Sequence, residues 1–290
     1  PLVFVRPFAY SLAHLEAARK VGATGFLPRT TPEECLVDDA AAHLLHTVGT
    51  RVPLSRAFHR VAKANGVSLP QGLFAGLTAD LNLIASAPHL LPRWLEMPDG
   101  HQVVGPVYAN LPGEVPEFVT DLAAGPKPLV YFAVGSSGNR DLVLDVLRGL
   151  GRADCQVLAP VRSHLHQEDL ETLPLNIHVT DWIPTHQLGD AVDLAITHGG
   201  EGTVQTSCVQ GWPFIGIPLQ LEQRFNVQRC VAFGSARLVS QKEARRADWA
   251  ALVREALTDD VMRSRAQRLA ELMKGLDGPG RAAEAICKLL

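Results

Sequence analysis

The sequence has few cysteines and no long apolar run, and each shortage excludes a class of protein. Its five cysteines are scattered over 290 residues without a Cys-x-x-Cys spacing, which argues against a zinc site or a disulfide framework. They predict buried thiols in a reducing compartment, hence a cytoplasmic protein. No apolar run reaches the ~18 residues that span a bilayer. The first residues, Pro1–Arg6, lack the charged start and cleavage site of a signal peptide.

An excess of charge of one sign is also missing. The 27 basic and 30 acidic residues give a net charge of −3, and the longest basic block is Arg245-Arg246. A protein that binds nucleic acid carries a basic patch, so no nucleic-acid partner is expected. The sequence contains no Asp-x-Asp motif, which predicts a site without a metal ion.

The composition is otherwise that of a globular protein of two domains. Hydrophobic residues make up 47% and charged residues 20%, and the 24 glycines and 20 prolines indicate many short connections. A stretch rich in Pro and Gly, residues 104–128, separates two halves of the chain that differ in their sequence patterns. We therefore predict an N-terminal domain over residues 1–111 and a C-terminal domain over residues 112–290.

Strands and helices alternate in the C-terminal half. Apolar runs predict strands, here Leu129–Val134, Gln156–Val161, Asn176–Ile183, Leu194–Thr197, Phe214–Ile217 and Arg237–Val239. Helical spacing of apolar residues predicts helices at Asp141–Leu150, Thr203–Gln210, Gln223–Phe233, Trp249–Leu257 and Val261–Leu276. This alternation predicts a parallel, doubly wound sheet, in which ligands bind beyond the carboxyl ends of the strands.

The N-terminal half is less regular. Leu2–Val5 and Leu81–Ser86 have the pattern of strands, and Leu12–Lys20 and Leu54–Ala64 that of helices. The chain begins with Pro rather than Met. Two similar Rossmann-like domains need nearer ~200 residues each. We therefore expect the N-terminal domain to be incomplete.

One strand end has the features of an anion site. The apolar run Leu194–Thr197 leads into His198-Gly199-Gly200, and a helix is predicted to open near Gly202-Thr203. Glycines allow a close approach of a ligand, and a helix N-terminus attracts a phosphate. His198 and Thr203 add side-chain donors, so a pyrophosphate could be held without a metal. The alternative is a plain tight turn with Thr203 as the N-cap.

The surrounding motifs identify a family. The order is Trp-x-Pro at 182–184, His-Gly-Gly-x-Gly-Thr at 198–203, Gly-x-Pro at 216–218 and Glu-Gln at 222–223. This order resembles the donor-site signature of the UDP-glycosyltransferase superfamily, closest to bacterial and sterol-type members. The resemblance covers about residues 129–239. It implies a GT-B fold of two Rossmann-like lobes, with a complete C-terminal donor lobe and a partial N-terminal acceptor lobe.

The resemblance implies a role for each matching residue. Trp182 would stack on the nucleotide base, with the Ile183 backbone beside it, unless Trp182 belongs to the core. Glu222 and Gln223 would bind the hydroxyls of the donor sugar, unless Glu222 is only a helix-start acid. The remaining donor-binding residues, on the phosphate side, would be Ser136, His198, Gly199, Gly200, Gly202, Thr203 and Asn226.

The sequence departs from the family pattern at three places, one of which is Thr185, where the plant-type pattern has a Gln after the Pro. Many members carry a Glu that binds the ribose eight positions after the motif His, where this sequence has Thr206. Glu201 brings a carboxylate next to the presumed phosphate site, where it would repel the donor unless it points away or meets a sugar hydroxyl.

The catalytic base is not marked by a motif. In the family, an inverting displacement uses a His in a Gly-His-x-x-Pro loop to activate the acceptor hydroxyl, and this loop is not found. His14 follows the first predicted strand and is the candidate, although it lies in a helical pattern. His43 and His46 are weaker candidates, and Glu201 is the next group to consider.

We therefore expect a metal-independent glycosyltransferase. It would move a hexose from a UDP- or TDP-sugar, its only co-substrate, to a small lipophilic alcohol or phenol. The alternatives are a non-catalytic nucleotide-sugar-binding module, a lipid-linked N-acetylglucosaminyltransferase and a sugar-nucleotide epimerase. A homo-oligomer, or a partner that supplies the acceptor lobe, is also compatible with the sequence.

Overall fold

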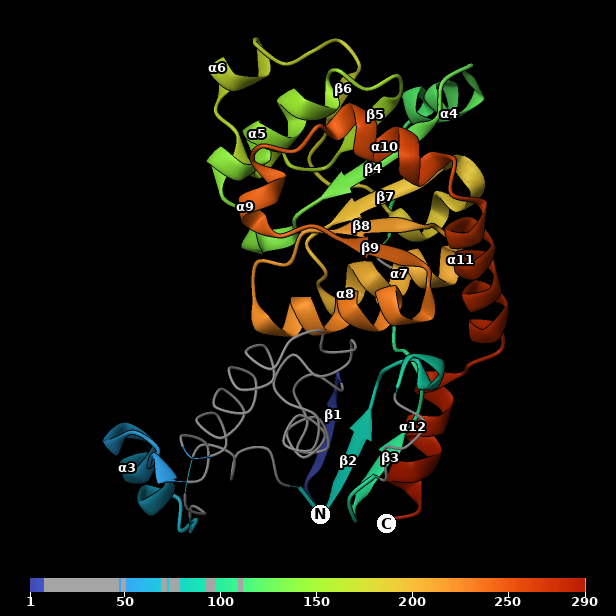
Figure 1. Ribbon diagram of the computed structural model, residues 1–290. Coiled ribbons are helices and arrows are strands. Elements are labelled where there is room, and N and C mark those ends of the chain that lie inside the picture. The colour runs from blue at the N-terminus through green and yellow to red at the C-terminus, as the bar shows by residue number, and fades with distance from the viewer. Residues whose placement is uncertain are drawn as a thin grey trace, which may run out of the picture. The chain divides into compact units, whose positions relative to one another are not determined.

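The chain forms two compact α/β units. The computed structural model describes residues 1–7, 47, 51–68, 72, 79–91, 97–108 and 112–289. The first unit is Pro1–Val107 with Asp277–Leu290, and the second is Tyr108–Leu276. Each unit has a parallel sheet of its own (Figure 1).

The sheet of the first unit has three parallel strands in the order β1-β2-β3, with Val5 opposite Leu83 and Leu83 opposite Gln102. Its described strands and longer helices are β1 (Val3–Arg6), α3 (Arg56–Ala64), β2 (Leu81–Ile84), β3 (His101–Val103) and α12 (Gly278–Cys287). Leu83 and Val104 pack against Ala282 and Ala285 of α12.

These units differ from the predicted domains 1–111 and 112–290, because the last helix belongs to the first unit. α12 is amphipathic, and its small residues Ala282 and Ala285 let it lie close to the small sheet. At its start, a Cβ on Gly278 would lie 2.1 Å from the Pro106 carbonyl oxygen, so only glycine fits there. The end of the chain therefore completes the first unit.

The second unit is built on six parallel strands in the order β6-β5-β4-β7-β8-β9. Their bounds are β4 (Leu129–Ala133), β5 (Gln156–Ala159), β6 (Ile177–Val179), β7 (Leu194–Thr197), β8 (Phe214–Gly216) and β9 (Ala236–Leu238). Every predicted strand of this half is present, although most are shorter than their apolar runs. The order reverses between β4 and β7, which makes the carboxyl ends of these two strands the topological switch point.

Helices cover both faces of this sheet. Their bounds are α4 (Glu117–Ala124), α5 (Arg140–Leu150), α6 (Gln167–Leu170), α7 (Glu201–Gln210), α8 (Leu221–Phe233), α9 (Gln241–Ala244), α10 (Trp249–Leu257) and α11 (Asp260–Met273). α5 contacts α9 and α10 on one face, while α7 contacts α8 and α11 on the other (Figure 1). Because both faces are covered, the central strands β4, β7 and β8 are buried along their whole length rather than alternating.

Three local predictions were wrong. α4 lies within the stretch that the Pro and Gly content suggested was a linker; it starts after Pro116 and buries Val119. α7 begins at Glu201 with Gly200 as its N-cap, earlier than Gly202-Thr203, so Thr203 is not the cap. α11 ends at Met273, because Lys274 leaves the helical conformation before Gly275, which has φ +76°.

The main core of the second unit lies between the sheet and the α5–α10 face. Phe132 of β4, Leu147 of α5 and Trp249 of α10 are among its fully buried side chains. Four of the cysteines fall in described residues and all are free thiols: Cys155, Cys208 and Cys230 are buried, whereas Cys287 is exposed, contrary to expectation. Cys35 lies outside the described residues.

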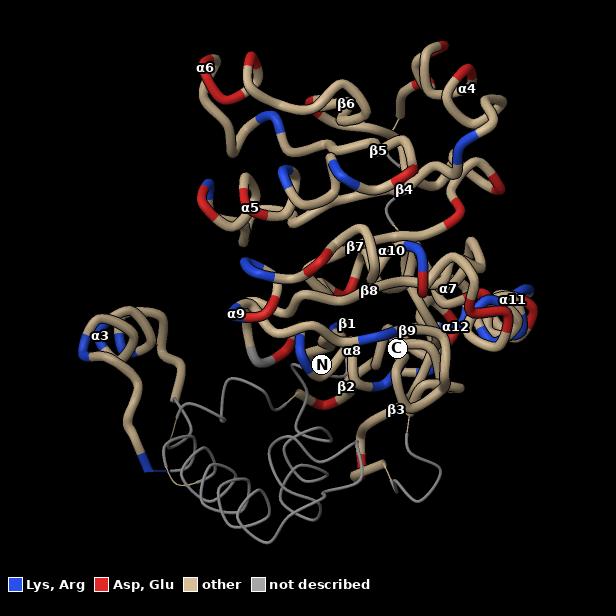
Figure 2. Tube along the Cα trace, turned by 45° about the horizontal axis from the view of Figure 1, so that its top comes forward, with Lys and Arg blue, Asp and Glu red and all other residues tan. Residues whose placement is uncertain are grey.

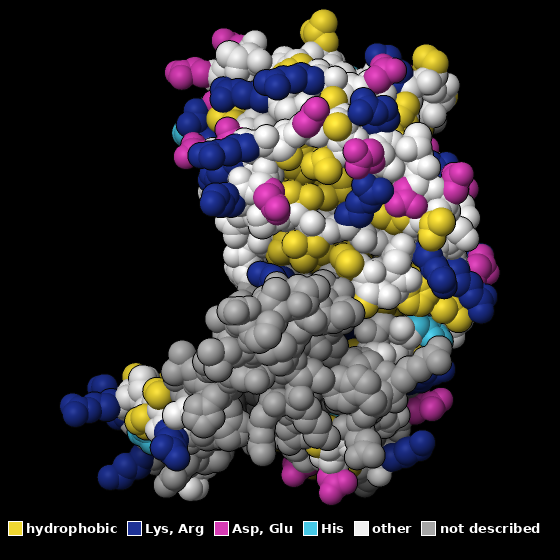
Figure 3. Space-filling model, in the orientation of Figure 1, with side chains coloured by type: hydrophobic (Ala, Val, Ile, Leu, Met, Phe, Trp, Pro, Cys, Tyr) yellow, Lys and Arg dark blue, Asp and Glu magenta, His cyan; other side chains and the backbone are white. Residues whose placement is uncertain are grey.

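The surface of the second unit mixes charges of both signs. Lys and Arg alternate with Asp and Glu along α5, α9 and α11 (Figure 2). Apolar side chains also gather among charged ones on the face seen in Figure 3. A hollow of about 790 Å³ lies beside the end of β9, against α9 and α10. Among the helices that the structure describes, none is long and apolar enough to cross a membrane.

Candidate donor site at the switch point of the sheet

Two loops meet where the strand order reverses. Ala133 of β4 is paired with Thr197 of β7, so the two strands end side by side. The loop after β4 is a short 3-10 turn, Gly135–Ser137, and the loop after β7 is His198–Gly200. The sequence predicted both loops, and the topology places them next to each other, in the position where doubly wound sheets bind ligands.

His198 lies between the two loops with glycine on either side. Its side chain is buried, and a Cβ on Gly135 would lie 2.9 Å from its Cε1 and Nε2 atoms. A Cβ on Gly200 would lie 2.5 Å from Nε2. Gly199 has φ +87° and no room for a side chain beside Val227. These glycines are therefore required by the packing around the imidazole.

Burial sets the charge of this imidazole. It lowers the pKa of His198 below the ordinary value for histidine, because the charged form is disfavoured away from water. The ring is therefore neutral at pH 7 and has one N–H to donate. Among the residues that the structure describes, none forms a hydrogen bond with Nδ1 of His198.

The first turn of α7 adds backbone donors. Val204 N donates to Gly200 O at 3.0 Å, so the N–H groups of Glu201, Gly202 and Thr203 precede the first bond within the helix. The Thr203 hydroxyl donates to Gly200 O at 2.9 Å and accepts from the Thr197 hydroxyl at 3.0 Å. This hydroxyl thus closes the turn. A Cβ on Gly202 would meet no atom within 4 Å, so that side of the turn is open.

The start of α8 is tied to the loop after β4. Oε1 of Gln223 accepts hydrogen bonds from Leu219 N at 2.9 Å and Gln220 N at 3.2 Å, while its Nε2 donates to the Ser137 hydroxyl at 3.0 Å. Gln223 is buried, so its amide supports the loop that precedes the helix. Ser136 itself is exposed in its turn. Its neighbour Ser137, which the motif did not single out, makes the link to α8.

Asn226 lies beneath the glycine loop and is completely buried. Its Nδ2 donates to Gly199 O at 3.1 Å and lies 3.5 Å from Glu222 Oε1. Asn226 therefore contacts the glycine loop through its amide and joins that loop to Glu222, which stands in the first turn of α8.

Trp182 lies on a separate part of the same edge, after β6. Its side chain is 50% exposed, whereas the neighbouring Ile183 is buried. A Cβ on Gly113 would lie 3.0 Å from its Cζ3 atom, so the indole packs on a backbone without a side chain. Trp182 is therefore not part of the core, and a half-exposed indole offers a surface on which a base can stack.

We expect Trp182→Ala to weaken binding of a nucleoside diphosphate by ~1–2 kcal/mol, the range for stacking of a base on an aromatic side chain. Calorimetric titration with UDP and TDP would measure it. Unfolding of the variant should be unchanged, because the side chain is half exposed. An unaltered dissociation constant in a folded variant would contradict base stacking at this position.

Besides Ser137, two further residues of the site were not predicted from the sequence. Nε2 of His164, in the loop after β5, donates to Gly135 O at 2.7 Å and so holds the loop after β4. Arg229 of α8 is buried and its Nη2 donates to Glu201 at 3.1 Å. A histidine after a predicted strand was a usable signal for His164. Nothing in the local sequence marked Arg229.

Of the residues considered as the catalytic base, Glu201 is the one that the structure describes. His14, His43 and His46 lie outside the described residues. Glu201 points toward α8: its carboxylate is bound by Arg229 at 3.1 Å and by Gln205 Nε2 at 2.7 Å. Within the described part of the chain, no cluster of three or more His, Cys, Asp and Glu residues could hold a metal ion.

A six-stranded parallel sheet with glycine-rich loops at its switch point defines a doubly wound α/β unit. Residues 144–289 match the family model described as the C-terminal domain of erythromycin biosynthesis protein CIII-like proteins. This match covers half of the chain. The chain therefore belongs to this family and to the UDP-glycosyltransferase superfamily, and its fold is GT-B.

Similar proteins agree with this assignment. The PGL/p-HBAD biosynthesis rhamnosyltransferase of Mycobacterium bovis (strain BCG / Pasteur 1173P2) is 29% identical over 192 residues, which are 66% of this chain and 42% of the relative. The chain thus spans less than half the length of that relative.

Among solved structures, the glycotransferase of kitacinnamycin is 19% identical, with a TM-score of 0.71 over 100% of this chain and 70% of that chain. The glycosyltransferase VinC in complex with DTDP is 18% identical, with a TM-score of 0.59 over 81% of this chain and 59% of that chain. At these identities the likeness shows the fold alone.

Proposed function

We propose that this chain supplies the donor-binding lobe of a metal-independent glycosyltransferase, which transfers a hexose from a UDP- or TDP-sugar to a small lipophilic alcohol or phenol by inverting displacement. The observation that carries the proposal is the His198 imidazole, buried and neutral, between two glycine loops at the start of α7. Such a site supplies N–H donors and a helix dipole to an anionic ligand.

The donor would span the edge of the sheet. Its base would stack on Trp182, with the Ile183 backbone beside it, and its diphosphate would be held by His198 and by the turn that contains Gly199, Gly200, Gly202 and Thr203. Glu222 would bind hydroxyls of the sugar, with Gln223 and Asn226 acting from the same helix α8 and Ser136 from the loop after β4. A DTDP complex among the structural neighbours supports a TDP-sugar as the donor.

The acceptor side rests on the sequence alone. His14 remains the proposed base, which would take the proton of the acceptor hydroxyl while the N–H donors of the donor site stabilise the departing diphosphate. A turnover assay of His14→Ala, with UDP and TDP affinity as the control, would test this role. Loss of turnover with intact nucleotide binding supports it, and unchanged turnover excludes it.

We expect UDP or TDP to bind with the same affinity in the presence of a chelator and of added magnesium. The reason is that backbone N–H groups and a neutral imidazole replace the metal as partners of the diphosphate. Isothermal titration calorimetry of the purified chain in both buffers measures this. Complete loss of binding in chelator would overturn the metal-independent site, and absence of binding in both buffers would overturn the proposed function.

A further inference from the structure

A carboxylate at the first position of α7 conflicts with the proposed function of that helix. Glu201 is the residue directly after the N-cap Gly200. An acid there is attracted by the same partial positive charge that a diphosphate would use. A free Glu201 carboxylate would therefore compete with the ligand for the helix dipole and repel its phosphates.

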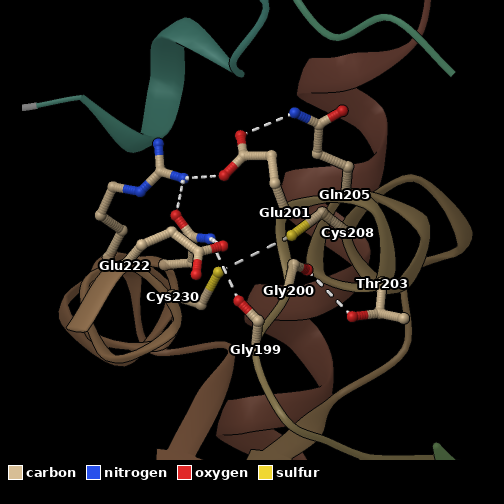
Figure 4. A network of polar contacts seen from close by, with 10 residues as sticks. Gly199, Gly200, Glu201, Thr203, Gln205, Cys208, Glu222 and Cys230 are labelled. Atoms are coloured by element: carbon tan, nitrogen blue, oxygen red, sulfur yellow. Dashed lines mark hydrogen bonds and ion pairs between the residues drawn. The ribbon is translucent and has the colours of Figure 1, made fainter. Parts of the chain in front are cut away.

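In the structure, the Glu201 carboxylate is bound by side chains of the protein and points toward Arg229 of α8. Its Oε2 accepts a hydrogen bond from Nη2 of Arg229 at 3.1 Å, and its Oε1 accepts one from Gln205 Nε2 at 2.7 Å (Figure 4). The Arg229 side chain is 2% exposed and the Glu201 side chain 12%. At this burial the ion pair is weakly screened by solvent. The negative charge of Glu201 is thus compensated within the protein.

The same guanidinium also reaches the glycine loop. Nη2 of Arg229 donates to Asn226 Oδ1 at 3.0 Å. The amide of Asn226 is thereby oriented with its nitrogen toward Gly199 O at 3.1 Å and toward Glu222 (Figure 4). One buried side chain on α8 therefore holds the loop before α7 and is linked to Glu222 in the proposed sugar site.

The buried ion pair between Arg229 and Glu201 is not expected to add to the stability of the fold. Among the described residues, Nε and Nη1 of Arg229 have no hydrogen-bond partner, although both atoms are buried. Its guanidinium lies over the Phe225 ring, 4.7 Å from the ring centroid, which recovers only part of the lost hydration. A buried ion pair with unsatisfied donors is usually no more stable than an apolar replacement. A role in the site accounts for the pair better.

We propose that Arg229 is a positioning residue of the donor site. It neutralises Glu201 and orients Asn226 against the Gly199 carbonyl, so that the first turn of α7 is left free to receive the diphosphate. The inference rests on the proposed function and names a residue that the donor-site motif does not include. We expect Arg229 to affect the affinity for a nucleoside diphosphate but not the affinity for a nucleoside.

The test compares two kinds of ligand on the full chain. Calorimetry gives the affinity for UDP and TDP, and NMR titration gives that for uridine and thymidine. Arg229→Met should lower the affinity for the diphosphates at least about tenfold, as expected when a charge-assisted contact network is lost. Affinity for the nucleosides should not change. Arg229→Lys keeps the charge and should retain more diphosphate affinity than Arg229→Met.

The decisive variant is the double change Arg229→Met with Glu201→Gln. Because it removes the carboxylate that Arg229 neutralises in the wild type, it should recover most of the diphosphate affinity that Arg229→Met loses. Glu201→Gln alone should leave diphosphate affinity equal to or higher than that of the wild type, and serves as the test if Arg229→Met does not fold. Arg224→Met is the matched control, because Arg224 lies on the same helix and is exposed.

Four outcomes of these measurements would overturn the inference while the proposed function stands, three of them in variants that lack Arg229. Those three are unchanged diphosphate affinity in Arg229→Met, an equal loss for diphosphates and nucleosides, and no recovery in the double variant. A fall in diphosphate affinity in Glu201→Gln alone would also overturn it. If the wild-type chain binds neither UDP nor TDP, the proposed function itself fails, and the inference fails with it.

Discussion

Replacing His198 with alanine should weaken binding of UDP, TDP and the corresponding nucleotide sugars by the same factor, about 10- to 100-fold. A hydrogen bond to a charged group contributes ~1.5–3 kcal/mol, which corresponds to this range. The diphosphate is common to all four ligands, and the imidazole lies between the loops that would hold it. Calorimetric titrations of each ligand would measure the factor.

The matched comparison is Glu222→Ala. If Glu222 binds only sugar hydroxyls, its loss should weaken nucleotide sugars by ~0.5–1.5 kcal/mol and leave free UDP and TDP unaffected. Gln223→Ala is a less selective probe, because the Gln223 amide also accepts from Leu219 N and Gln220 N. Equal weakening of free UDP by Glu222→Ala would show that the sugar lies elsewhere, and unchanged UDP affinity in His198→Ala would remove His198 from the phosphate site.

Replacing Trp249 with alanine should lower the free energy of unfolding by ~3–5 kcal/mol, the usual cost of truncating a large buried aromatic side chain. Trp249 is 1% exposed, and a Cβ on Gly149 of α5 would lie 2.3 Å from its Cδ1 atom. Its indole N–H also donates to Ala244 O at 2.9 Å. The residue thus joins α5, α9 and α10 in the core of the second unit.

Urea denaturation followed by circular dichroism would measure this effect. Trp182→Ala is the control of the same chemical type, because the half-exposed Trp182 should affect nucleotide binding but not unfolding. A loss below ~1 kcal/mol for Trp249→Ala would mean that the core between α5 and α10 repacks around the missing ring.

The sequence by itself determined the strands and the nature of the site loop. Apolar runs such as Leu194–Thr197 mark a strand because a parallel strand is buried on both faces. The sequence His198-Gly199-Gly200 indicated a tight turn because positive φ and close packing are local demands that glycine meets. These features depend on neighbours in sequence, and the pattern therefore revealed them.

Only the tertiary structure decided which side chains face inward and what they contact. Asn226 and Gln223 match the family motif equally well as ligand-binding or as loop-supporting residues, and their burial against Gly199 and Ser137 is a result of how α8 packs on the sheet. Arg229 had no motif at all, because its partner Glu201 is 28 residues away. Contacts between distant residues depend on strand order and helix packing, which no local pattern encodes.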